Sequence, residues 1–113
     1  MTVVVVDDER TFTTGGDDII YFRNVDGAIL YLAKHIAAYT LHYADKVEQL
    51  WLDHDLGEHG GDIMELVEFM ELTPVAVAQV LVHSQNPSGA DRIVSKLNGR
   101  YKAKRVALPE LET

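Results

Sequence analysis

The pattern of apolar and polar residues predicts short strands that alternate with longer helices. The strand segments are short apolar runs rich in valine and isoleucine, whereas apolar residues in the helical segments recur at intervals of three and four. The predicted strands are residues 3–6, 19–22, 47–52, 77–82 and 102–107. The predicted helices are residues 26–42, 63–72 and 88–98. This alternation is typical of an α/β fold with a parallel sheet and right-handed crossovers.

Polar residues at the boundaries support this division. Asp26 is the expected N-cap of the first helix, and Ser88 with Asp91 three residues later predicts a capping box for the last one. Residues 10–18 contain Thr-Thr-Gly-Gly and have no helical period, so we expect a loop there.

The strands end in polar clusters that carry candidate chemistry. Asp7, Asp53 and His83 each come directly after an apolar strand segment. Ligands of parallel sheets bind beyond the carboxyl ends of the strands. We therefore expect these three residues, which are far apart in the sequence, to meet in one crevice.

Length and composition limit the class of protein. A chain of 113 residues that is 47% hydrophobic and 25% charged predicts one globular domain over residues 1–113. The first nine residues lack the basic region of a secretory signal, and no apolar run approaches the roughly 20 residues of a membrane span. We expect a cytoplasmic protein. Because the chain has no cysteine, a bound metal would be held by oxygen or histidine ligands.

Charge is unevenly distributed along the chain. A net charge of −8 argues against broad binding to DNA. Six of the ten basic residues nevertheless lie in one late segment: Arg92, Lys96, Arg100, Lys102, Lys104 and Arg105. They could guide a phosphate-bearing ligand, or they could simply protect an edge strand and solvate a helix face.

Carboxylates at adjacent strand ends suggest a divalent cation. Asp7, Asp8 and Asp53 would repel one another at neutral pH, and Mg²⁺ prefers such oxygen ligands together with a substrate phosphate. Mn²⁺ could replace it, and Asp55 is a further candidate ligand. The alternative is that Asp7 and Asp8 only cap or turn the chain.

The order of these residues resembles the receiver domain of two-component signalling. An acidic pair ending strand one, a phospho-accepting aspartate ending strand three and a hydroxyl ending strand four match Asp7 and Asp8, Asp53 and Ser84. Gly61 matches the glycine that opens the next helix, whereas the lysine of strand five has no counterpart in register. The resemblance implies a flavodoxin-like, five-stranded parallel sheet of order 2-1-3-4-5. The first and last receiver helices would be reduced or absent.

A narrower resemblance covers three strings at these strand ends. The strings at 7–10, 52–57 and 83–89 are similar to the cyclic-phosphate processing receiver-like family, which is proposed to act on cyclic phosphate ends of RNA. This implies metal-dependent processing of 2′,3′-cyclic phosphates on RNA ends or nucleotides. Asp53, His54 and His83 would be catalytic, with the histidines as acid and base. The residues expected to bind substrate are Arg10, Ser84 and Asn86, together with backbone amides that open the last helix.

Other functions remain open on the sequence alone. The chain could be a signalling receiver phosphorylated on Asp53, or a non-catalytic binding module of the same fold. Each histidine could also be structural. If the three remaining helices cover one face of the sheet, Gln49, Trp51, Gln79 and Leu81 would lie on the other. We expect a second copy of the chain to cover that face, forming a homodimer.

Overall fold

The computed structural model describes residues 2–8, 11–12, 19–84, 86–106 and 111–112. Its larger sheet has five parallel strands, in the spatial order β3-β1-β4-β5-β6. These strands are β1 (Thr2–Val6), β3 (Ile19–Phe22), β4 (Val47–Asp53), β5 (Val77–His83) and β6 (Ala103–Arg105). Counted along the parallel strands, this is the predicted order 2-1-3-4-5. The α/β receiver-like fold is therefore confirmed.

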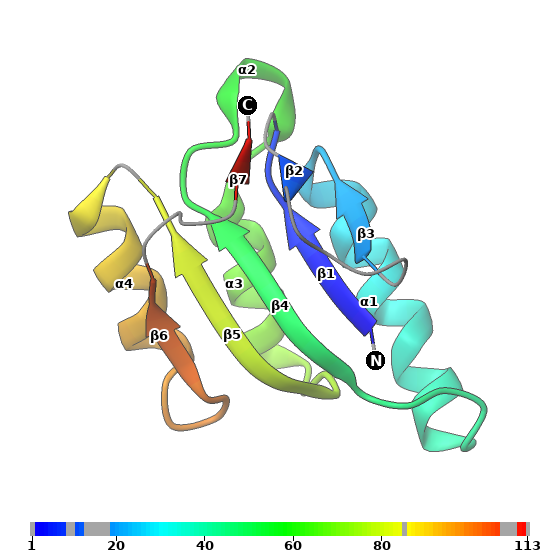
Figure 1. The fold of residues 1–113 in the computed structure, drawn as a ribbon. Coiled ribbons are helices and arrows are strands. Elements are labelled where there is room, and N and C mark those ends of the chain that lie inside the picture. The colour runs from blue at the N-terminus through cyan, green and yellow to red at the C-terminus, as the bar shows by residue number, and fades with distance from the viewer. Residues whose placement is uncertain (1, 9–10, 13–18, 85, 107–110, 113) are drawn as a thin grey trace.

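Three helices cover one face of this sheet, as Figure 1 shows. They are α1 (Val25–Thr40), α3 (Ile63–Leu72) and α4 (Pro87–Leu97). Their apolar sides pack on the alternate strand residues that point the same way, such as Val4, Leu50 and Val80, all of which are fully buried. A further short helix, α2 (Gly57–Gly60), follows β4. The prediction that the surviving crossover helices share one face is confirmed.

The positions of the first and last receiver helices are occupied differently. Among the described residues between β1 and β3 there is no helix, only the two-residue strand β2 (Thr11–Phe12). It pairs in antiparallel fashion with β7 (Leu111–Glu112), which follows β6. This two-stranded pairing joins segments from opposite ends of the chain, and the sequence pattern did not predict it. Within the described parts of the chain, no helix is both long and apolar enough to cross a bilayer.

The predicted helix caps were wrong. Asn24, not Asp26, caps α1, because its side chain accepts a hydrogen bond from the Gly27 amide at 2.8 Å. The helix ends at Thr40, two residues early, and His42 follows with a positive φ of 64°. Asn86, not Ser88, caps α4. In both cases a polar residue two positions earlier starts the helix, which sequence spacing alone did not distinguish.

The face without helices is only partly open. Trp51 and Leu81 lie opposite each other in register on this face, as do Gln49 and Gln79. Leu81 is only 4% exposed, and Val5 beside Trp51 is fully buried, although neither belongs to the helix-facing core. The two glutamines and Trp51 are half-buried. That a second copy covers this face stays a prediction.

Candidate functional site

Three carboxylates meet at the carboxyl ends of β1 and β4. Asp7 directly follows β1 and Asp53 is the last residue of β4, and the two strands are paired up to Val6 and Leu52. Together with Asp8, they offer oxygen atoms that all lie within 4.8 Å of one another. Asp7 is 1% exposed and Asp53 4% exposed. The predicted convergence of these strand ends is confirmed.

This group of residues fits a hard divalent cation by its chemistry. Its donors are all carboxylate oxygens, and two of the three side chains are buried, where mutual repulsion is strong. A metal ion is a common way to hold such charges together, and Mg²⁺ and Mn²⁺ favour oxygen ligands. The acidic cluster (Asp7, Asp8 and Asp53) could therefore bind a metal.

Gly57 makes room for one of these carboxylates. A Cβ atom on Gly57 would lie 2.6 Å from Oδ2 of Asp8, closer than side chains tolerate. The same glycine has a positive φ of 72°, which residues with a side chain rarely adopt. Local chain geometry and the close approach of Asp8 thus both require glycine at the start of α2.

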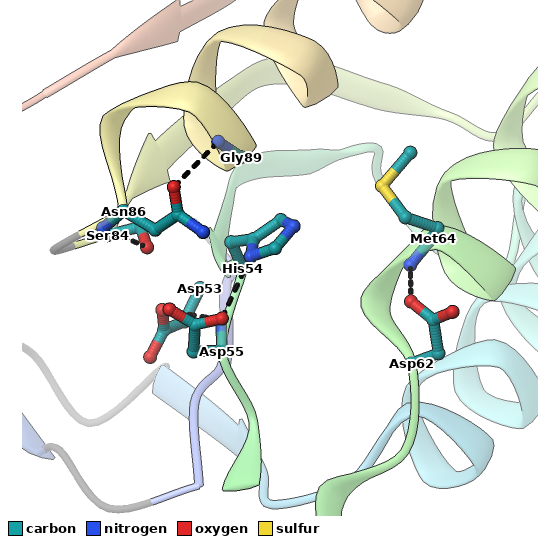
Figure 2. A network of polar contacts seen from close by, with 8 residues as sticks. All are labelled: Asp53, His54, Asp55, Asp62, Met64, Ser84, Asn86 and Gly89. Atoms are coloured by element: carbon teal, nitrogen blue, oxygen red, sulfur yellow. Dashed lines mark hydrogen bonds and ion pairs between the residues drawn. The ribbon is translucent and has the colours of Figure 1, made fainter.

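Asp55 lies with a histidine and is not part of the acidic cluster. Its Oδ1 is 2.9 Å from Nδ1 of His54, and its own backbone amide donates to Oδ1 of Asp53 at 3.2 Å (Figure 2). The His54 ring lies against the first turn of α4. A Cβ atom on Gly89 would come within 2.5 Å of two ring carbons and 2.6 Å of Nδ1. The contact with Asp55 therefore orients the His54 ring beside the cluster, and the missing side chain of Gly89 leaves room for the ring against α4.

His83 lies beneath this surface. It is opposite Asp53 in the sheet register and its side chain has no exposed area. Nδ1 is 3.8 Å from Oδ2 of Asp7, and the ring packs against Trp51 with centroids 5.7 Å apart. The side chain contacts a candidate metal ligand, whereas its burial keeps it from the solvent side where a substrate would bind.

Ser84 and Asn86 form the turn between β5 and α4. The Asn86 amide donates to Oγ of Ser84 at 3.0 Å, and Oδ1 of Asn86 accepts from the Gly89 amide at 3.1 Å (Figure 2). The Ala90 amide donates to the Asn86 carbonyl, and Pro87 has no amide hydrogen. Among the hydrogen bonds between described residues, those of the first turn of α4 leave the Ser88 amide without a partner in the helix or its cap. The Ser84 hydroxyl and the Asn86 side-chain NH₂ can still donate.

The remaining residues of the sequence prediction fall elsewhere. Arg10 lies outside the described residues. His35 is buried in α1, with Nε2 2.7 Å from the Asp45 carbonyl oxygen, and His42 and His59 are exposed. None of these three histidines belongs to the group around Asp53.

A family comparison agrees with this arrangement. The model of the cyclic-phosphate processing receiver domain matches residues 2–99. The chain belongs to this family. The matched range contains all the strand-end motifs described above. The resemblance at residues 7–10, 52–57 and 83–89 is therefore confirmed. Neither curated proteins nor solved structures gave a significant match.

Two site residues of this cyclic-phosphate processing receiver domain were missed by the sequence reasoning. Gly57 and Gly89 were both inside strings that were singled out, but neither was given a function. Their importance comes from side chains that approach them, Asp8 and His54, which lie on other segments. The sequence feature that marked them is a glycine within the polar string that follows a strand end.

Proposed function

We propose that this domain hydrolyses 2′,3′-cyclic phosphates, on nucleotides or RNA ends, with the help of a divalent cation. The observation that carries the proposal is the position of the His54–Asp55 pair directly beside the acidic cluster. A site that only accepts a phosphoryl group needs the carboxylates but has no use for a histidine oriented by a second aspartate. Hydrolysis of a cyclic ester uses the carboxylates, which hold the cation, and also the oriented histidine, which transfers a proton.

Asp7, Asp8 and Asp53 would hold the cation. A bound Mg²⁺ would offset the charge of the nonbridging phosphate oxygens and so favour attack at phosphorus. In this assignment Asp55 is not a ligand, because its carboxylate is bonded to His54 and is absent from the group within 4.8 Å.

His54 would transfer the proton. Nδ1 faces the Asp55 carboxylate, so a hydrogen on Nδ1 fixes the tautomer and leaves Nε2 to act. Water adds to phosphorus, one bond from phosphorus to a ribose oxygen breaks, and that oxygen takes up a proton. The product is a phosphate monoester with a neighbouring hydroxyl group. Nε2 can accept the proton of the water or supply the proton of the leaving oxygen.

Ser84 and Asn86 would bind the phosphate. Their remaining donors, a hydroxyl and a side-chain amide, lie at the turn that precedes α4, close to its positive end. His83 is buried, so we assign it a positioning role on Asp7 in place of direct contact with the substrate. If His83 positions Asp7, the variant His83→Phe should bind the metal more weakly, although it keeps an aromatic ring against Trp51.

The decisive experiment is turnover of 2′,3′-cyclic nucleotides and of cyclic-ended RNA, with and without Mg²⁺. We expect hydrolysis by the wild type that EDTA abolishes. Asp53→Asn should lose both turnover and Mn²⁺ binding measured by calorimetry. His54→Ala should lose turnover and keep Mn²⁺ binding. His59→Ala is the matched control, because His59 is an exposed histidine outside the site.

Two results would contradict the proposal. Turnover that both the Asp53 and the His54 variants retain would show that these residues do not carry the reaction. No turnover by the wild type, together with acetyl phosphate labelling that Asp53→Asn abolishes, would instead establish a signalling receiver.

A further inference from the structure

The charge of this chain is strongly polarised. Residues 86–106 contain six basic residues and one acidic residue, a net charge of +5. The rest of the chain contains four basic and 17 acidic residues, a net charge of −13. In space the basic segment is one structural unit, because it comprises α4 and the edge strand β6, which lie together at one side of the sheet (Figure 1).

Part of this positive charge is neutralised. Arg105 is bonded to Asp91 at 3.0 Å, and Lys96 is 3.9 Å from Glu71. Arg100 donates to the Glu71 carbonyl. Arg92, Lys102 and Lys104, by contrast, are exposed and make no ion pair with any residue that the structure describes. We call Arg92, Lys102 and Lys104 the basic edge.

The two lysines of the basic edge lie on the face of the sheet to which strand alternation also directs Asp53, because Asp53 follows the core residue Leu52. They flank Ala103, which points into the helix-covered core, so both are directed to the opposite face. Lys104 is opposite Leu81, two residues before His83, on the neighbouring strand. Strand geometry puts its backbone about 10 Å across the sheet and about 7 Å along it from Asp53. The long lysine side chain shortens that separation.

The other side of the site has the opposite charge. A groove of about 510 Å³ runs beside His54, and its lining includes Asp55, Glu58 and Asp62. Glu58 and Asp62 are exposed. A polyanion bound at the acidic cluster would be repelled along the groove and attracted along the basic edge.

We propose that the basic edge binds the phosphate backbone of a single-stranded RNA whose 3′ end lies at the acidic cluster. The proposal takes the position of the reacting end from the proposed function. It adds the path of the RNA, which runs over β6 and the middle of α4, where Arg92 lies, and away from the groove lined by residues 54–62. Protection of an edge strand also explains lysines on β6, but it requires no affinity for RNA.

The test is RNA binding that does not depend on turnover. A fluorescein-labelled, short single-stranded RNA with a plain 3′-phosphate cannot be hydrolysed at a cyclic ester. Its anisotropy with Mg²⁺ present gives the Kd at several salt concentrations. The test variant is Lys102→Gln/Lys104→Gln. The matched control is Lys34→Gln/Lys46→Gln, which makes the same change in net charge at two exposed lysines outside the basic edge.

The expected results are specific to the basic edge. The test variant should bind RNA about tenfold more weakly at low salt, and its slope of log K against log salt should fall by about 1.4, since each phosphate contact of a single strand contributes about 0.7. The control should match the wild type. Equal binding by all three proteins, or no binding by the wild type at low salt, overturns the proposal. Neither outcome depends on whether cyclic nucleotides are hydrolysed.

Discussion

Substitution of Gly89 by alanine should separate activity from stability in this domain. A Cβ atom at this position would lie 2.5 Å from Cγ and Cδ2 of His54. Ordinary contacts between carbon atoms are about 3.5 to 4.0 Å, so the ring must retreat by at least about 1 Å. That movement takes Nδ1 from its 2.9 Å contact with Asp55.

The expected sizes of the effects on stability and on activity depend on what else Gly89→Ala changes. Gly89 lies in the first turn of α4 and is not among the glycines with positive φ, so alanine fits the backbone. Alanine favours a helix over glycine by up to about 1 kcal/mol, which offsets part of the clash. A misplacement of about 1 Å in a catalytic group can cost about 100-fold in rate, or about 2.7 kcal/mol.

The assay is kcat/KM for a 2′,3′-cyclic nucleotide, with Mn²⁺ affinity and Tm measured on the same samples. We expect Gly89→Ala to lower kcat/KM about 100-fold and leave Mn²⁺ affinity within about twofold. Ser95→Ala, at an exposed position of the same helix, should match the wild type. Wild-type activity in Gly89→Ala would refute the argument that a fixed His54 ring is needed.

Three further predictions test other parts of the structure. Gly57→Ala should weaken Mn²⁺ binding by tenfold or more in calorimetry, because its Cβ displaces Asp8 and its φ is positive. Burial raises the pKa of Tyr31. Above about pH 10 the unfolded state loses this proton before the folded state does, so the free energy of unfolding should fall as the pH rises. Denaturant titrations should show a smaller fall for Tyr31→Phe. Sedimentation at micromolar concentration should give twice the 12.6 kDa chain mass if a second copy covers the helix-free face, and a monomeric mass would contradict that prediction.

The charge asymmetry around the site has a consequence for substrate choice. A cyclic mononucleotide has no upstream phosphates and makes no use of the basic edge. On the proposed path, an RNA end would gain attraction from Lys102 and Lys104 and avoid Glu58 and Asp62 on the other side. The ratio of kcat/KM for RNA ends to that for mononucleotides should therefore decrease as salt increases, because salt weakens the additional phosphate contacts that only the RNA makes.

Sequence alone determined the five strands of the parallel sheet, its three longer helices and the acidic part of the site. Apolar periodicity is a local property, and the abrupt change from valine or leucine to aspartate marked the strand ends at Asp7 and Asp53. In a parallel sheet these ends must lie at one edge, so the meeting of the carboxylates followed from strand order. That order came from the resemblance to receiver domains.

Only the tertiary structure decided how the other polar residues divide their functions. Asp53 joins the acidic cluster, whereas Asp55, two residues further on, lies outside it and contacts His54. His83 ends a strand as Asp53 does, but its side chain has no exposed area and contacts Asp7. The contact of His54 with Gly89 and the pairing of β2 with β7 join segments far apart in the chain. Local patterns do not record such contacts, because they depend on how separate elements pack against each other.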